Sequence, residues 1–418
     1  MASNTYKVIE PVERGEVRKV STAVFLNYLV ANLGYYTLLP TLPLLFAEAR
    51  HSSAWFVGTA LFTLAFSVRV ACLLLGGILR TLTIRAATAG GLLIPAIGFG
   101  LLAVASGPVP TLVCLALAGT GISVNTLMAR TYIALALPSA AARNTAFSAV
   151  QVAVNVAAAV GPIAANLLFS SDRHGLTVLV PAALYAIGAV AVAFAVPAGV
   201  RAGDNDERKA TVLGAIRSIV TEPQVRTVMA ITVAGWFLYG QLFSALTLHI
   251  SSITTSPLLR SSFFTANAVL VVLVQIPVSA HANRRLDTGM PPTRFLLIGV
   301  GIFAAAFASM AGLGALIAGC FVAVVVFSIA ETFFTPFVST AFAEISGSRP
   351  VIEAFVLLQI AMAVGEPLGS FSGGTLFTAL SRHGLEPLYW AMLAAVAMLV
   401  VVACARRGRV ATSVPTAR

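Results

Sequence analysis

Long, uninterrupted apolar runs recur along almost the whole chain of 418 residues, from Ser21 to Cys404. About 20 consecutive helical residues cross a hydrocarbon layer that is about 30 Å thick. Backbone in that layer must satisfy its own hydrogen bonds, so only helices and closed barrels can span it. Barrel strands would show short alternating segments rather than solid apolar runs. The sequence therefore predicts an all-α, polytopic membrane protein.

Polar breaks divide the apolar sequence into twelve predicted spans. These are residues 21–47, 54–79, 86–105, 110–135, 145–169, 177–199, 227–249, 261–280, 294–313, 315–342, 351–378 and 388–405. The longest hydrophilic stretch, 201–226, separates the sixth span from the seventh. We therefore expect one six-helix bundle at 21–200 and another at 227–405, with a polar arm at 1–20 and a tail at 406–418.

Basic residues give the chain a formal net charge of +11, which by itself would suit a nucleic-acid partner. With the N-terminus assigned to the cytoplasm, 21 of the 26 Lys and Arg residues fall in cytoplasmic segments and four in external ones. The positive-inside rule accounts for this asymmetry. We expect both termini in the cytoplasm and the lipid bilayer, not nucleic acid, as the partner. The excess of Arg over Lys favours a GC-rich bacterial genome, and hence the bacterial inner membrane.

No motif for cofactor, metal or nucleotide chemistry is apparent in the sequence. The four cysteines all fall within spans without paired spacing, and the five histidines form no ligand cluster. No glycine-rich phosphate loop with a following Lys-Ser or Lys-Thr occurs, so ATP is not the expected energy source. We expect no metal, no cofactor and no catalytic residue. A transporter is thus favoured over an enzyme, with a polytopic membrane enzyme or receptor as the alternative of a different class.

Three charged residues lie deep within predicted spans, namely Arg69, Glu331 and Glu366. Glu is too short to reach water from such a depth, and a buried charge is therefore paired, protonated or exposed to a wet cavity. These three residues are the predicted proton-coupling group, with Glu331 as the proton carrier. The alternative for Glu331 is a structural hydrogen bond to a neighbouring helix.

An internal repeat relates the two halves of the chain. Asn125 matches Glu331, because each lies 18 residues before an arginine, Arg143 or Arg349. The segment AFSAVQ (146–151) matches AFVLLQ (354–359), and Gly161 matches Gly369. Repeats of this kind predict two pseudo-symmetric six-helix bundles with a binding site near the membrane midplane between them.

Polar and aromatic residues on shared helical faces are the predicted lining of that site. In the first span, Asn32, Tyr35 and Tyr36 lie on one face together with Tyr28, because their spacing follows the helical period. The full set of predicted substrate contacts is Asn32, Tyr35, Tyr36, Asn125, Trp236, Tyr239, Gln241 and Glu331. Plain packing of the aromatic residues is the alternative interpretation.

Several motifs make the chain resemble the major facilitator superfamily, and within it the twelve-span drug:proton antiporter group. The run AAAVGPIAANLL (157–168) is similar to the antiporter signature of the fifth helix, and AETFFTPFVSTAFAEI (330–345) to the tenth helix. GILRTLTIR (77–85) matches the superfamily's loop between helices 2 and 3 at Gly77, Leu79 and Arg85, but Thr81 and Ile84 replace an Asp and a Gly. In the second half Asn283, followed by Arg284, stands at the Asp position, and Leu115 replaces the basic residue of the fourth helix.

The resemblance implies alternating-access transport by a monomer that takes protons and a small-molecule substrate. It places helix 2 beside helix 11, so Arg69 and Glu366 could pair across the halves, with separate local pairing inside each half as the alternative. Structural or gating roles would fall to Gly77, Arg85, Gly161, Pro162, Asn283 and Arg284. We expect proton-coupled export of a small, partly apolar compound, as in drug or metabolite efflux and multidrug resistance. Uptake or efflux of a sugar or another small metabolite is the alternative.

Overall fold

The computed structural model describes residues 14–79, 81–137, 140–171, 173–197, 217–346 and 351–412, and this part of the chain is almost entirely helical. The predicted all-α fold class is thereby confirmed. Outside the described residues lie most of the predicted polar arm, the linker up to residue 216, residues 347–350, which include Arg349, and residues 413–418 of the tail.

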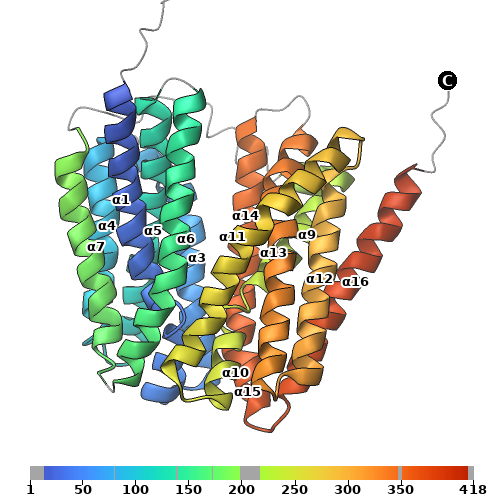
Figure 1. The fold of residues 1–418 in the computed structure, drawn as a ribbon. Helices are drawn as coiled ribbons and strands as arrows, with labels where there is room; N and C mark the ends of the chain where they lie inside the picture. Colours follow the sequence, from blue (N-terminus) through green and yellow to red (C-terminus); the bar gives the residue numbers. More distant parts are fainter. Residues whose placement is uncertain are drawn as a thin grey trace, which may run out of the picture.

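The helices follow one another along the chain in two sets (Figure 1). The first set comprises α1 (Arg14–Leu38), α2 (Leu42–Leu44), the π-helix η1 (Leu45–Ala49), α3 (Ala54–Leu79), α4 (Ile84–Leu102), α5 (Pro108–Ala136), α6 (Ala140–Ser170) and α7 (Leu176–Ala195). The second set comprises α9 (Pro223–Tyr239), α10 (Ala245–Ile253), α11 (Pro257–Asp287), α12 (Pro292–Leu313), α13 (Ile317–Ser346), α14 (Val351–Ser372), the π-helix η2 (Gly373–Phe377), α15 (Thr378–Ser381) and α16 (Glu386–Thr412).

Ten helical stretches of the described residues are long and apolar enough to cross a membrane. The two other predicted spans are also helical, but one of them is interrupted. The span at 227–249 is divided into α9 and α10 by a turn that starts at Gly240. The span at 351–378 is formed by α14 and continues through η2. All twelve predicted apolar runs are therefore helical over most of their length.

Proline marks the places where helices start, stop or bend. α1 ends at Leu38, two residues before Pro40, because proline has no N–H to continue the hydrogen-bond ladder. By contrast, α5, α9, α11 and α12 have a proline in the first turn, where no such donor is needed. Pro162 lies inside α6, and Pro367 lies inside α14, where each can bend its helix.

The two halves repeat one packing pattern. In the first half, α1 packs against α6 and α7, α4 against α5 and α7, and α3 against α5. In the second half, α9 packs against α14 and α16, α12 against α13 and α16, and α11 against α13. Each helix of the first half thus has a counterpart in the second, as the sequence repeat predicts.

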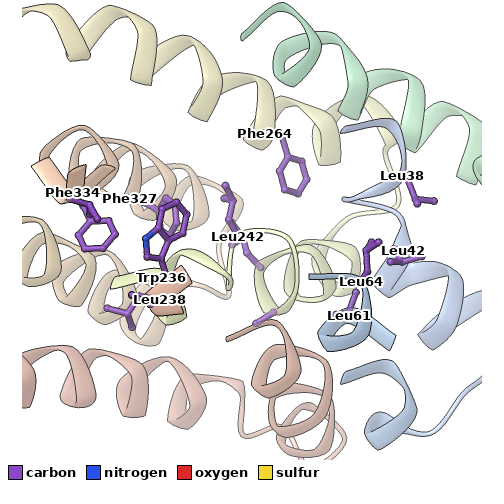
Figure 2. Close-up of a cluster of buried hydrophobic side chains, with 14 of the residues drawn as sticks. Leu38, Leu42, Leu61, Leu64, Trp236, Leu238, Leu242, Phe264, Phe327 and Phe334 are labelled. Carbon is purple, nitrogen blue, oxygen red and sulfur yellow. The ribbon is translucent and has the colours of Figure 1, made fainter. Parts of the chain in front are cut away.

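Buried hydrophobic side chains form a continuous core that extends through both halves. Figure 2 shows Leu38, Leu42, Leu61 and Leu64 on one side and the aromatic residues Trp236, Phe327 and Phe334 on the other, with Leu242 and Phe264 between them. The rings of Trp236 and Phe334 lie 6.0 Å apart between centroids in an edge-to-face arrangement, which is favourable for aromatic pairs. This core holds the helices that carry the polar residues discussed below.

The halves touch through α3 with α14 and η2, through α6 with α11, and through α2 with α10. In Figure 1 the two halves lie closest together at the end of the molecule away from both chain termini. At this end Gly58 of α3 packs against Gly374 of η2, so closely that a Cβ on either glycine would collide with the other helix. The ring of Trp55 packs edge-on against Phe371, with 5.0 Å between centroids.

The contact between α6 and α11 completes this closure. Ser261 Oγ donates a hydrogen bond of 2.9 Å to the carbonyl oxygen of Pro162, and Thr265 Oγ1 donates one of 2.9 Å to that of Ala159. Within the first half, Gly161 of α6 lies against Tyr36 of α1, where a side chain would not fit. We refer to the contacts that Gly58, Gly374, Ser261 and Thr265 make across the halves as the interhalf seal.

Arg85 and Arg284, two of the predicted gating residues, lie far from the seal. Arg85 is half-buried in the first turn of α4, and Arg284 is exposed in the last turn of α11. The side-chain surroundings of Gly77 and Asn283 lie outside what the structure describes. The gating roles of all four residues therefore stay predictions.

A C-terminal fusion tests the predicted orientation of the chain. Because basic residues concentrate in the segments assigned to the cytoplasm, alkaline phosphatase fused after Arg418 should be inactive, whereas a fluorescent protein fused there should be bright. The comparison is made in intact bacterial cells at equal expression. An active phosphatase fusion would show that the C-terminus is outside.

Candidate functional site

An ion pair connects the two halves in the interior of the helix bundle. Arg69 of α3 and Glu366 of α14 approach to 2.5 Å between Nη2 and Oε2, and Arg69 Nε donates a second hydrogen bond of 2.6 Å to the same oxygen. Only 24% of the Arg69 side chain and 14% of the Glu366 side chain are exposed. The cross-half pairing considered from the sequence is therefore the observed one, and local pairing inside each half is not.

The guanidinium group of Arg69 has a second partner in the other half. Its Cζ lies 5.3 Å from the centroid of the Trp236 ring in α9, within the range of a cation–π interaction. Trp236 is 7% exposed and packs edge-on against Tyr239, with 5.1 Å between centroids. A carboxylate and an indole thus fix the Arg69 side chain between α3, α9 and α14.

A cavity of about 190 Å³ lies beside this ion pair, between the halves. Five tyrosines and two asparagines contribute to its wall, together with Arg69 and Glu366. Of the predicted substrate contacts, those that line the cavity are Asn32, Tyr35, Tyr36, Asn125 and Tyr239. Most of the wall comes from α1, α3, α5 and α7, so the first half encloses the larger part of this space.

Gln241, which the sequence analysis assigned to substrate binding, lies outside the cavity wall. Its side chain is fully buried and its Nε2 donates to the carbonyl oxygen of Gly369 at 3.0 Å. Its Oε1 accepts a hydrogen bond of 2.7 Å from the hydroxyl of Tyr389. Gln241 Nε2 also donates to the carbonyl oxygen of Phe237 in α9 at 3.2 Å. The amide thus joins the interrupted span to α14 and α16.

Trp236 and Glu331, two further predicted contacts, lie behind the wall. Asn267 Nδ2 of α11 donates a hydrogen bond of 3.1 Å to Glu331 Oε2, and the same amide donates to Ser328 Oγ at 3.0 Å. The Tyr239 side chain lies beside this carboxyl. Among the described residues, Glu331 thus has neutral partners only. Tyr239 stands between Glu331 and the cavity, because it contacts both.

Asn125 differs from the other amides of this region. It is 4% exposed, and within the described part of the chain its side chain makes no hydrogen bond, although its Oδ1 is buried. Asn32, by contrast, donates from Nδ2 to the carbonyl oxygen of Tyr28 at 2.8 Å. Asn125 therefore presents an unpaired amide at the wall of the cavity.

The sequence analysis assigned no role to Asn267, the hydrogen-bond partner of Glu331. Asn267 is 8% exposed and is 64 residues away from Glu331 along the chain. Its isolated position in an apolar span was a usable signal, since a buried amide requires partners. The identity of that partner was not visible in the sequence.

Comparison with known proteins identifies the family. A family model described as Major Facilitator Superfamily matches residues 24–327. The chain belongs to this superfamily. An uncharacterized transporter of the same superfamily from Mycobacterium tuberculosis (strain ATCC 25618 / H37Rv) is 24% identical over 396 residues, which cover 92% of each chain. The protein is therefore a multi-pass membrane transporter and not an enzyme.

Solved transporter structures share the fold. A crystal structure of a POT family transporter in complex with a thioalcohol-conjugated peptide aligns with a TM-score of 0.75 at 12% identity, covering 91% of this chain and 94% of that one. A variant of the nucleoside transporter NupG aligns with a TM-score of 0.74 at 13% identity, covering 93% and 99%. At these identities the likeness concerns the fold alone.

Proposed function

We propose that the protein exports a small, partly apolar organic compound from the bacterial cytoplasm in exchange for protons, by alternating access between the two halves. The cavity between the halves is the proposed substrate site, and Glu331 is the proposed proton carrier. The residues that would contact substrate are Asn32, Tyr35, Tyr36, Asn125 and Tyr239, with Arg69 and Glu366 at the border between the halves.

The observation that carries the proposal is the environment of Glu331. This carboxyl lies inside a membrane-spanning helix, where Asn267 donates a hydrogen bond to it and Tyr239 lies beside it. A carboxylate without a cation in such a position is unfavourable unless water reaches it, whereas the protonated form is tolerated. A cycle that alternately hydrates and dries Glu331 would therefore load and release one proton, as coupled transport requires.

The position of the interhalf seal bears on the side of the membrane from which the cavity is reached in this state. If both termini lie in the cytoplasm, as the charge distribution predicts, the interhalf seal faces the outside. The substrate site would then be reached from the cytoplasm in this state. A transporter that waits in this state is suited to collecting a compound from the cytoplasm.

Transport of a polar metabolite is the second candidate, and the polar wall of the cavity favours it. Tyrosine hydroxyls and asparagine amides can hydrogen-bond a sugar or a similar solute, and the structural neighbours include transporters crystallised with peptide and named for nucleosides. In this case protons and substrate could move in the same direction. The direction in which protons move relative to the substrate distinguishes the two candidates.

Liposomes that contain the purified protein and the pH dye pyranine can measure that direction. Addition of a partly apolar probe such as benzamide or chloramphenicol outside should make the interior more alkaline, because each inward substrate movement expels protons. Protein-free liposomes are the control. Acidification on addition of glucose would favour metabolite symport, and the absence of any proton movement with all three probes would contradict both candidates.

A further inference from the structure

The size of the central cavity limits the compound that it can hold. Its volume is about 190 Å³, whereas pockets for drug-sized ligands enclose roughly 300–1,000 Å³. The rings of Tyr36 and Phe243, 6.0 Å apart between centroids, come from opposite halves and narrow the space between them. The cavity therefore suits a compound of metabolite size.

The charges at the cavity wall compensate each other. Arg69 and Glu366 are its two oppositely charged members, and they form the ion pair described above. Glu331 does not line the cavity, and Tyr239, which does, lies beside it. A charged ligand would either have to separate the pair or lie uncompensated in the membrane interior, and both are unfavourable. A ligand with no net charge avoids both penalties.

Asn125 supplies the unused polar group at this wall. Its amide makes no hydrogen bond with any described residue, although buried polar groups nearly always have a partner. Gly91 of α4 lies directly behind it, and a Cβ at Gly91 would come within 2.7 Å of the Asn125 backbone nitrogen. The close approach of α4 holds Asn125 at the wall. An amide can both donate and accept, so it matches a hydroxyl or amide group.

We infer that the cavity binds an uncharged, metabolite-sized compound whose hydroxyl or amide group hydrogen-bonds the side chain of Asn125. Asn125 is then a specificity-determining residue of the first half. The inference rests on the proposed function in one respect, namely that this cavity is the transport site. It narrows the substrate from any partly apolar compound to small neutral ones with a hydrogen-bonding group.

Binding to the purified full-length protein tests the inference without any gradient. Benzamide, benzoate and benzamidine have nearly the same size and are neutral, anionic and cationic. myo-Inositol serves as a second neutral probe and tetraphenylphosphonium as a large cation. Affinities come from thermal-shift titrations, because a ligand that binds only the folded state stabilises it by an amount that grows with the ratio of its concentration to Kd. Benzamide or myo-inositol should bind more tightly than the three charged probes.

Two substitutions test whether the amide of Asn125 forms the hydrogen bond to the ligand. Asn125→Leu keeps the approximate size but removes the hydrogen bond, and should weaken binding of the preferred neutral probe about tenfold or more. Asn125→Asp adds a negative charge and should shift the preference toward benzamidine. Asn27→Leu is the matched control, because Asn27 is also a buried amide with an unpaired Oδ1 but does not line the cavity. It should leave the affinities unchanged.

Tighter binding of benzamidine, benzoate or tetraphenylphosphonium to the wild type, or no binding of either neutral probe, would overturn the inference. So would unchanged affinities in Asn125→Leu. If that variant does not fold, the order of wild-type affinities alone decides. Binding as expected without proton movement in liposomes would refute the export proposal and leave this inference intact. If the protein instead prefers to bind a cation and exchanges it for protons, this inference fails and the export proposal stands.

Discussion

Arg69→Ala and Glu366→Ala should each abolish transport and sharply reduce the amount of folded protein in the membrane. Each substitution leaves its former partner as an unpaired charge among α3, α9 and α14. Removal of one member of a buried ion pair typically costs roughly 3–5 kcal/mol, which is comparable to the whole stability of many domains. The double variant removes both charges, so its folded amount should recover substantially.

The amount of folded protein can be measured by fluorescence-detected size-exclusion chromatography of each variant after mild solubilisation. Arg382→Ala is the matched control, since Arg382 is exposed in a connecting segment and should tolerate the change. If the double variant loses as much folded protein as the two single variants lose in sum, the two residues do not act as a pair.

Glu331→Gln should eliminate accumulation driven by a pH gradient while it leaves folding and downhill movement of substrate largely intact. Gln has the same size and keeps an oxygen that can accept the hydrogen bond from Asn267 Nδ2, but it cannot bind or release a proton. Asn125, its counterpart in the repeat, is itself a neutral amide within a membrane-spanning helix. Accumulation should fall to the level of vesicles without the transporter.

Inverted membrane vesicles energised by respiration provide the measurement, with wild type and variant at matched expression. Glu344→Gln is the control, because Glu344 is an exposed acid near the end of the same helix, α13. Undiminished accumulation by Glu331→Gln would exclude Glu331 as the proton carrier. A variant that also stops downhill movement would indicate a structural role.

The sequence predicted the fold because the membrane limits the possible structures so strongly. Runs long enough to span the bilayer must be helices, and their polar breaks located the connections well. The break after Tyr239 was missed, since the run from 227 to 249 is mostly apolar and Gly240 alone does not end a helix. The compensating hydrogen bonds of Gln241 come from α14 and α16, more than a hundred residues away in sequence.

The sequence predicted which residues of one helix face line the cavity, but not how the faces of different helices meet. Helical spacing indicates which residues share a face, and Asn32, Tyr35 and Tyr36 do line one cavity. It does not indicate how the faces of different helices meet. For that reason Glu331 and Trp236 were expected at the wall but lie behind it, and Asn267 was not assigned as the partner of Glu331.

The Arg69–Glu366 pair lies away from the ends of α3 and α14, and this position matters for how fast the halves can move. When two rigid bodies rock against each other, displacement grows with distance from the axis, so the ends of the helices travel far and the centre hardly moves. A bridge at the centre can therefore stay closed throughout the swing. The two ions then need not be separated and rehydrated in every cycle, which removes a large activation barrier. The contacts that would have to be broken and remade at each turnover are then those of the interhalf seal, such as the ones around Gly58 and Ser261.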